Sequence, residues 1–126
     1  MRRRASGYSG RDGIMPRNIS FAMTTEQVKA RQKDITRRFG WWFLKPGDRL
    51  CGVEKAMGLK KGEKIKRLCE IEVVSVRAEP LNAITPEDVV REGFPDWTPQ
   101  DFIDFLVSHY GCDPTKTVNR IEFKYI

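Results

Sequence analysis

One segment near the middle of the chain alternates polar and apolar residues for longer than an average strand. Residues 67–76 read RLCEIEVVSV, with a single slip in phase at Val73-Val74. A period of two residues predicts a β-strand with one buried face, and a phase slip is typical of a β-bulge. A long, bulged strand is characteristic of a small β-barrel, so this segment limits the fold more than any other.

Four further segments are predicted to be strands. The last of them, residues 118–126, alternates Ile121, Phe123 and Tyr125 with charged residues, which indicates one buried face. The other predicted strands are residues 18–21, 34–38 and 49–54, and a lysine- and glycine-rich hairpin tip is expected at residues 58–64.

Three helices are indicated by their start signals. Thr24 followed by Gln27 resembles a capping box for a helix that ends near residue 31. Thr85 and Thr98 each precede a proline, which is favoured in the first turn, and each helix is followed by a glycine. No regular βαβ alternation is present, which disfavours a doubly wound nucleotide-binding fold. We therefore predict an α+β fold, a small mixed or antiparallel β-barrel flanked by short helices.

The length of 126 residues suits one domain, and no apolar run is long enough to span a membrane. The three cysteines, Cys51, Cys69 and Cys112, are odd in number and form no Cys-x-x-Cys pair. This pattern argues against a disulfide framework and favours a reducing compartment. We expect a cytoplasmic, monomeric protein that uses no cofactor and does not associate with membranes.

The net charge of +6 is distributed unevenly along the chain. Residues 1–40 carry +7, residues 41–79 carry +3 and residues 80–126 carry −4. Residues 1–17 are rich in arginine, glycine and serine, so we predict a disordered basic tail followed by a domain at residues 18–126. Concentrated positive charge favours binding to nucleic acid or another anion.

The basic segment at residues 31–38 offers the clearest chemistry. On a strand, Thr36 and Arg38 point to the same side, and Lys33 lies at the bend that precedes them. Cationic neighbours such as Arg37 disfavour a protonated lysine and lower its pKa, which would make Lys33 a base and Thr36 a nucleophile. The alternative is a basic strand edge that binds phosphates or faces water.

Trp41 and Trp42 follow this segment and are open to two interpretations. Aromatic side chains beside a basic strand can stack on unpaired bases, but they can also fill the core of a small barrel. Adjacent residues on a strand face opposite sides, so one of the two tryptophans is a candidate for stacking on a ligand.

The single histidine, His109, shares a predicted helix face with Phe102, Phe105 and Leu106. We therefore expect a histidine in or at the edge of the core. One histidine and scattered cysteines do not support a metal site.

Several short motifs together resemble the activating-signal-cointegrator homology (ASCH) family. They are Lys33-x-x-Thr36-x-Arg38, KPGDRL at residues 45–50, EGF at residues 92–94 and IEF at residues 121–123. The resemblance covers about residues 18–126, although the family usually has glycine where this chain has Arg31. It implies a barrel of the PUA-like superfamily with a cleft for RNA or a modified nucleoside.

The resemblance also implies roles for individual residues. Small bacterial members of the family are amidohydrolases that act on N(4)-acetylcytidine. By that likeness Lys33 would be the general base, Thr36 the nucleophile and Glu92 an acid/base partner, with Glu87 or Asp88 as alternatives to Glu92. Arg38 would bind an anionic or carbonyl group of the ligand.

Three functions follow from these expectations. The first is binding of RNA, other single-stranded nucleic acid or a modified nucleoside in a basic cleft. That cleft would be lined by Lys33, Thr36, Arg37, Arg38, one of Trp41 and Trp42, and Glu92. The second is an amidohydrolase that removes an acyl group from a cytidine amine. The third is a non-catalytic interaction module that docks a protein through the acidic residues 80–126.

Overall fold

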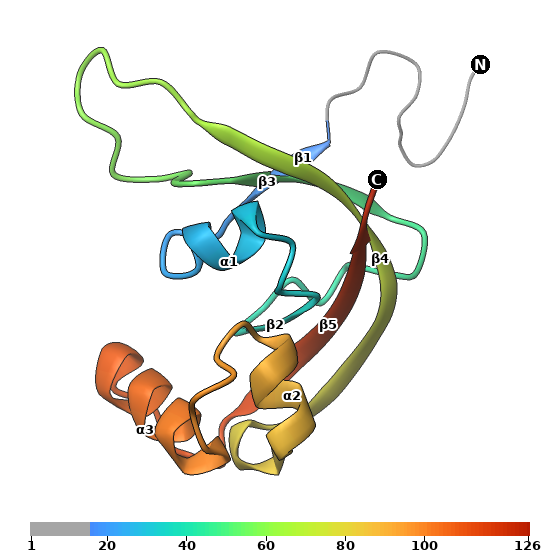
Figure 1. Cartoon of the computed structure of the whole chain (residues 1–126), viewed down its shortest axis with the longest axis vertical. Helices are drawn as coiled ribbons and strands as arrows, with labels where there is room; N and C mark the ends of the chain where they lie inside the picture. The colour runs from blue at the N-terminus through green and yellow to red at the C-terminus, as the bar shows by residue number, and fades with distance from the viewer. Residues whose placement is uncertain (1–15) are drawn as a thin grey trace.

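The computed structural model describes residues 16–126 (Figure 1). In chain order the elements are β1 (Arg17–Ser20), α1 (Thr25–Lys29), β2 (Ile35–Arg38), β3 (Arg49–Val53), β4 (Arg67–Pro80), a 3-10 turn (Leu81–Ala83), α2 (Pro86–Arg91), α3 (Pro99–Tyr110) and β5 (Thr117–Tyr125). Most of the predicted basic tail lies outside the described residues, and its last residue, Arg17, already belongs to β1.

The strands form one mixed sheet in the order β1-β3-β4-β5-β2. β1 pairs with β3 in parallel, and the other neighbours are antiparallel. The sheet curls around α1 into a half-barrel, while α2 and α3 lie together at the other end of the molecule (Figure 1). The predicted α+β fold, a small mixed β-barrel flanked by short helices, is confirmed. β1 and β2 are the two edges of the sheet, so the barrel is open between them.

β4 connects the two ends of the molecule. Its first part pairs with β3 and its later part with β5. The ladder with β5 shifts register between Val73 and Ser75, which is the bulge that the phase slip predicted. The strand continues to Pro80, four residues beyond the predicted end.

Two separate hydrophobic clusters stabilise the fold. The cluster inside the half-barrel comprises Ile19, Phe21, Val28, Leu44, Leu50, Ile71, Val73, Ile121 and Phe123. The cluster under the helices comprises Leu81, Ile84, Val89, Phe102, Ile103, Leu106 and Val118. β5 contributes to both, because its inward-facing residues start at Val118 and continue to Phe123.

The start signals of the later helices are confirmed. The Thr85 hydroxyl accepts a hydrogen bond from the Asp88 amide, and Thr98 and Asp101 form a reciprocal capping box. The predicted capping box at Thr24 is wrong: its backbone (φ −133°, ψ 32°) is not extended and its side chain accepts no cap hydrogen bond. α1 ends at Lys29, two residues before the predicted end near residue 31. No helix within residues 16–126 has the length and apolar character needed to cross a membrane.

Candidate functional site

A cavity of about 270 Å³ lies where the half-barrel is open. One wall is formed by residues 20–24, which follow β1, and another by β2. α3 supplies an apolar and aromatic wall, and Glu92 lies at the end of α2. The cavity therefore collects residues that are up to about 90 positions apart in the sequence.

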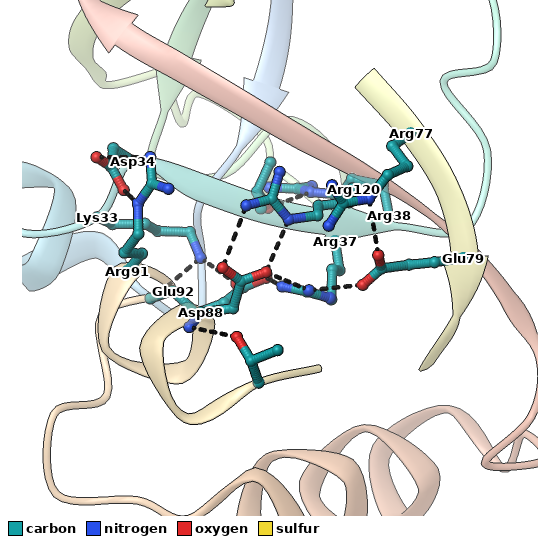
Figure 2. Close-up of polar contacts among 12 residues, drawn as sticks. Lys33, Asp34, Arg37, Arg38, Arg77, Glu79, Asp88, Arg91, Glu92 and Arg120 are labelled. Atoms are coloured by element: carbon teal, nitrogen blue, oxygen red, sulfur yellow. Dashed lines mark hydrogen bonds and ion pairs between the residues drawn. The ribbon is translucent and has the colours of Figure 1, made fainter. Parts of the chain in front are cut away.

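Lys33 and Glu92 form a buried ion pair on the floor of this cavity. Lys33 Nζ donates to Glu92 Oε1 at 2.6 Å and to the Glu92 carbonyl at 2.9 Å (Figure 2). Each side chain is only 3% exposed. Burial lowers the pKa of Lys33, and the Glu92 carboxylate opposes that effect. The nearby guanidinium groups of Arg37 and Arg38 lower the same pKa further, as the sequence predicted.

The backbone holds both partners of this pair in place. The Tyr125 hydroxyl donates to the Lys33 carbonyl, and the Asp34 amide donates to the Arg91 carbonyl at 3.0 Å. Glu92 is followed by Gly93, which has a φ of 106°. A Cβ at Gly93 would lie 2.8 Å from Gln27 Cγ, so glycine allows the end of α2 to pack closely on α1.

Arg37 is the centre of a second buried set of charges. Its guanidinium donates to Asp88 Oδ2 at 2.6 Å, Glu79 Oε2 at 2.8 Å and Glu92 Oε2 at 3.2 Å (Figure 2). Arg120 donates to both oxygens of Asp88, at 2.7 and 3.1 Å. The hydrogen-bond donors of Arg37, which the sequence analysis assigned to ligand binding, are therefore taken up by three carboxylates. We call Lys33, Arg37, Arg120, Glu79, Asp88 and Glu92 the buried charge network.

The network shifts the pKa of its members. Burial raises the pKa of Asp88, but the hydrogen bonds from Arg120 and Arg37 outweigh burial and lower it to about 2. Burial lowers the pKa of Arg37, and its carboxylate partners reverse that effect and raise it. Asp88 is thus held as an anion and Arg37 as a cation.

Thr36 and Arg38 face the same cavity, as the strand spacing predicted. Arg38 Nε donates to Thr36 Oγ1 at 2.9 Å, and Arg38 Nη2 donates to the Ser20 carbonyl at 2.7 Å. Within residues 16–126, Arg38 forms no ion pair, and the Thr36 hydroxyl bonds neither Lys33 nor Glu92. The three proposed catalytic residues therefore share one cavity, but only two of them are in direct contact.

The structure does not bring Trp41 and Trp42 to this cavity. Both lie in the loop between β2 and β3, where Trp41 has a φ of 60°. Trp41 packs against the half-barrel core, whereas the Trp42 side chain is 55% exposed. The alternation argument failed here because it assumed a strand, and the chain turns after Gly40 instead.

The aromatic residues that do line the cavity come mainly from α3 and the loop before it. Phe94 and Phe105 line the cavity, and both pack on Trp97, which is not a lining residue, at 4.1 and 5.2 Å between ring centroids. His109 continues this row 6.1 Å from Phe105 and is exposed at the cavity rim. Of the two positions expected for this histidine, the core interior is therefore excluded, because the apolar face of α3 extends past the core into the cavity wall.

Within the described part of the chain, no three side chains of histidine, cysteine, aspartate or glutamate are grouped so as to hold a metal ion. Glu79, Asp88 and Glu92 are directed at arginine and lysine instead. Glu79 was not expected in the network, and Asp88 was expected only as an alternative to Glu92, although the four-residue spacing of Asp88 and Glu92 on one helix face was a usable signal for both.

No family model and no curated protein matches this sequence. Solved structures do match. A protein of family DUF984 from Enterococcus faecalis superposes with a TM-score of 0.63 at 16% identity, covering 91% of this chain and 82% of its own. The hypothetical protein PH0355 superposes with a TM-score of 0.60 at 18% identity, covering 88% of this chain and 97% of its own.

An ASCH domain from Lactobacillus crispatus superposes with a TM-score of 0.53 at 13% identity, covering 82% of this chain and 70% of that domain. This chain has an ASCH fold. In this chain the open edge of the half-barrel, and with it the cavity, lies between β1 and β2.

Proposed function

We propose that this ASCH-fold protein binds a nucleoside, either free or as one unit of an RNA strand, in the cavity between β1 and β2. The observation that carries the proposal is the pairing of a polar floor with an aromatic wall in one small cavity. Lys33 and Arg38 offer donors, Glu92 offers an acceptor and Thr36 can do both. Phe105 and His109 offer ring faces.

A nucleobase matches this combination. Its edge carries both donors and acceptors, and its faces stack on aromatic side chains. The volume of about 270 Å³ lies just below the usual range for drug-sized ligands, which suits one nucleoside and excludes a stacked series of bases. Of the three cations that line the cavity, Lys33 and Arg37 are paired with carboxylates, and Arg38 alone forms no ion pair within residues 16–126. This largely compensated charge favours a neutral base over a phosphate.

Calorimetry with cytidine, uridine and acylated cytidine tests this proposal. His109→Ala removes a ring face at the cavity rim, and Arg38→Gln removes a charged donor that lines the cavity. We expect each variant to weaken nucleoside binding about tenfold. Val90→Thr alters an exposed residue of α2 and serves as the control with unchanged affinity. Absence of binding to every nucleoside, or wild-type affinity in both the His109 and the Arg38 variant, would refute the proposal.

A second candidate is the removal of an acyl group from a cytidine amine. It is favoured by one observation: a buried lysine with a lowered pKa shares the cavity with a threonine and a glutamate. Arg38 Nε donates to Thr36 Oγ1, which leaves the hydroxyl proton free to be given to a base.

In this reaction Thr36 Oγ attacks the acyl carbon while the neutral Lys33 amine takes the hydroxyl proton. The carbon–nitrogen bond then breaks, and the leaving amine takes that proton from Lys33. Water hydrolyses the threonine ester and releases a carboxylate, which regenerates the hydroxyl. Glu92 would hold the Lys33 amine in position through both steps.

Release of acetate from N(4)-acetylcytidine measures this activity. We expect Thr36→Val to abolish turnover and Thr36→Ser to retain part of it, because serine keeps the hydroxyl. The rate should rise with pH through the lowered pKa of Lys33, since only the neutral amine accepts a proton. Equal turnover in the wild type and Thr36→Val would exclude Thr36 as the nucleophile.

A further inference from the structure

The hairpin between β3 and β4 carries a dense group of lysines that the cavity does not use. Residues 54–66, here called the lysine hairpin, contain five lysines and two glutamates. The hairpin extends beyond α1 on the side of the molecule where the turn after β1 lies (Figure 1). The hairpin thus lies on the same side as residues 20–24, which line the cavity.

A second hollow lies at the lysine hairpin and shares one lining residue with the cavity. It has a volume of about 220 Å³ and is lined by Ala22 together with hairpin residues that include Lys55, Lys64 and Lys66. Ala22 also lines the nucleoside cavity. The two hollows therefore both border the turn after β1, and Lys64 lines the second of them.

The charges within the hairpin are only partly compensated. Glu63 lies 3.6 Å from Lys55, and Glu54 lies 3.8 Å from Lys66. These pairs occupy both glutamates. The remaining lysines are Lys60, Lys61 and Lys64. All three are exposed, and none forms an ion pair with another residue of the described segment 16–126.

The cavity and the hairpin thus differ in the charge that they offer. On the cavity floor, Lys33 and Arg37 are held by carboxylates, so a phosphate gains little there. Along the hairpin, three cations face solvent without such partners. A nucleotide chain has a matching pair of parts: a neutral base, which suits the cavity, and a charged phosphate backbone, which suits the lysine hairpin.

We propose that the lysine hairpin binds the phosphate backbone of a single-stranded polynucleotide whose base occupies the cavity. The inference rests on the proposed function and narrows it, because it makes the ligand one nucleotide within a strand and not a free nucleoside. A single strand is required because the base must be unstacked and unpaired to enter the cavity. Phosphates near Lys60, Lys61 and Lys64 would release counterions on binding.

The test compares a nucleoside with single-stranded oligonucleotides of RNA and of DNA that contain it. The variant carries Lys60→Gln, Lys61→Gln and Lys64→Gln. The matched control carries Lys45→Gln, Lys116→Gln and Lys124→Gln, which removes the same charge from exposed positions outside the hairpin. Affinities are measured by fluorescence anisotropy and calorimetry across a range of salt concentrations.

We expect the wild type to bind an oligonucleotide at least tenfold more tightly than the nucleoside at low salt. The hairpin variant should lose this advantage, and the slope of log affinity against log salt should become shallower by about 2, the value for three phosphate contacts on a single strand. Its nucleoside affinity should stay unchanged. The control variant should keep most of the wild-type slope.

An unchanged oligonucleotide affinity and slope in the hairpin variant would overturn the inference. Equal competition by a polyglutamate peptide of the same charge would also overturn it, because the hairpin would then be a general anion surface. If the wild type does not bind the nucleoside, the proposed nucleoside site in the cavity is wrong. If the hairpin variant keeps the wild-type salt slope, the proposed phosphate site on the hairpin is wrong. The two failures are therefore distinguishable.

Discussion

Two segments of this chain carry the same net charge and are used in opposite ways. Residues 31–38 contain four cations and one anion, and residues 54–66 contain five and two, so each has a net charge of +3. In the first segment Lys33 and Arg37 are buried and paired with carboxylates. In the second, Lys60, Lys61 and Lys64 remain exposed. Segment charge alone therefore does not identify a binding surface.

The partners of each segment explain the difference. The carboxylates that neutralise residues 31–38 come from β4 and α2, which are distant in sequence and adjacent in space. Among residues 16–126, the hairpin lysines form ion pairs only with the hairpin's own two glutamates. Buried charges are costly to leave unpaired, whereas exposed ion pairs contribute little to stability. Four measurements can test this contrast.

The largest expected effect is on Glu92. Glu92→Gln preserves size but removes the charge that Lys33 and Arg37 share, so we expect the free energy of unfolding to fall by about 3–5 kcal/mol. Urea denaturation measures it. Glu87→Gln on the same helix, where Glu87 is exposed, should cost less than about 1 kcal/mol. Similar losses in both variants would contradict the difference between buried and exposed charge.

The next effect is a loss of stability in acid. The pKa of Asp88 is lowered to about 2 in the folded protein from 3.8, so its ion pairs contribute fully above about pH 4. As the pH falls from 4 to 2, the unfolded chain takes up the proton first and about 2 kcal/mol of stability is lost. Chemical denaturation at several pH values measures this loss. Asp88→Asn should be less stable at neutral pH and should lack this part of the acid dependence.

A smaller effect is expected where a neutral group supports the network. Tyr125→Phe removes the hydroxyl that donates to the Lys33 carbonyl, at a cost of about 1 kcal/mol. Thermal unfolding followed by circular dichroism measures the change. Tyr110→Phe, at an exposed residue of α3, is the matched control and should leave the melting temperature unchanged. A larger loss in the control than in Tyr125→Phe would contradict this assignment.

The smallest effect is expected in the lysine hairpin. Replacing Lys60, Lys61 and Lys64 together with glutamine should change the free energy of unfolding by less than about 0.5 kcal/mol, because these side chains are exposed and unpaired within residues 16–126. Urea denaturation at low and high salt measures it. A loss comparable to that of Glu92→Gln would show that the hairpin supports the fold, and the contrast would then fail.

Local signals in the sequence predicted much of the fold. The bulge in β4 follows from a phase slip at Val73-Val74, and the caps of α2 and α3 follow from Thr85 and Thr98. These features depend on residues that are neighbours in the chain. The cap at Thr24 was wrong because the Thr24 backbone is not in the extended conformation that capping by its side chain requires.

The candidate site was predictable only in part. Strand alternation placed Thr36 and Arg38 on one face, and the family resemblance indicated Glu92. The pairing of Arg37 with Asp88 and Glu79 depends on the packing of α2 against β2 and β4, which no local pattern specifies. The aromatic wall was missed for a related reason, because the period of α3 does not tell a core face from a cavity face.

The gap between β1 and β2 is bridged by a side chain, from Arg38 to the Ser20 carbonyl. A main-chain ladder opens as a unit, but one guanidinium can change partners by a rotation about its own bonds. A ligand oxygen that accepts the Arg38 hydrogen bond therefore competes with Ser20. Binding in the cavity and separation of β1 from β2 are therefore thermodynamically linked. A ligand in the cavity also changes how readily the two edges of the sheet separate.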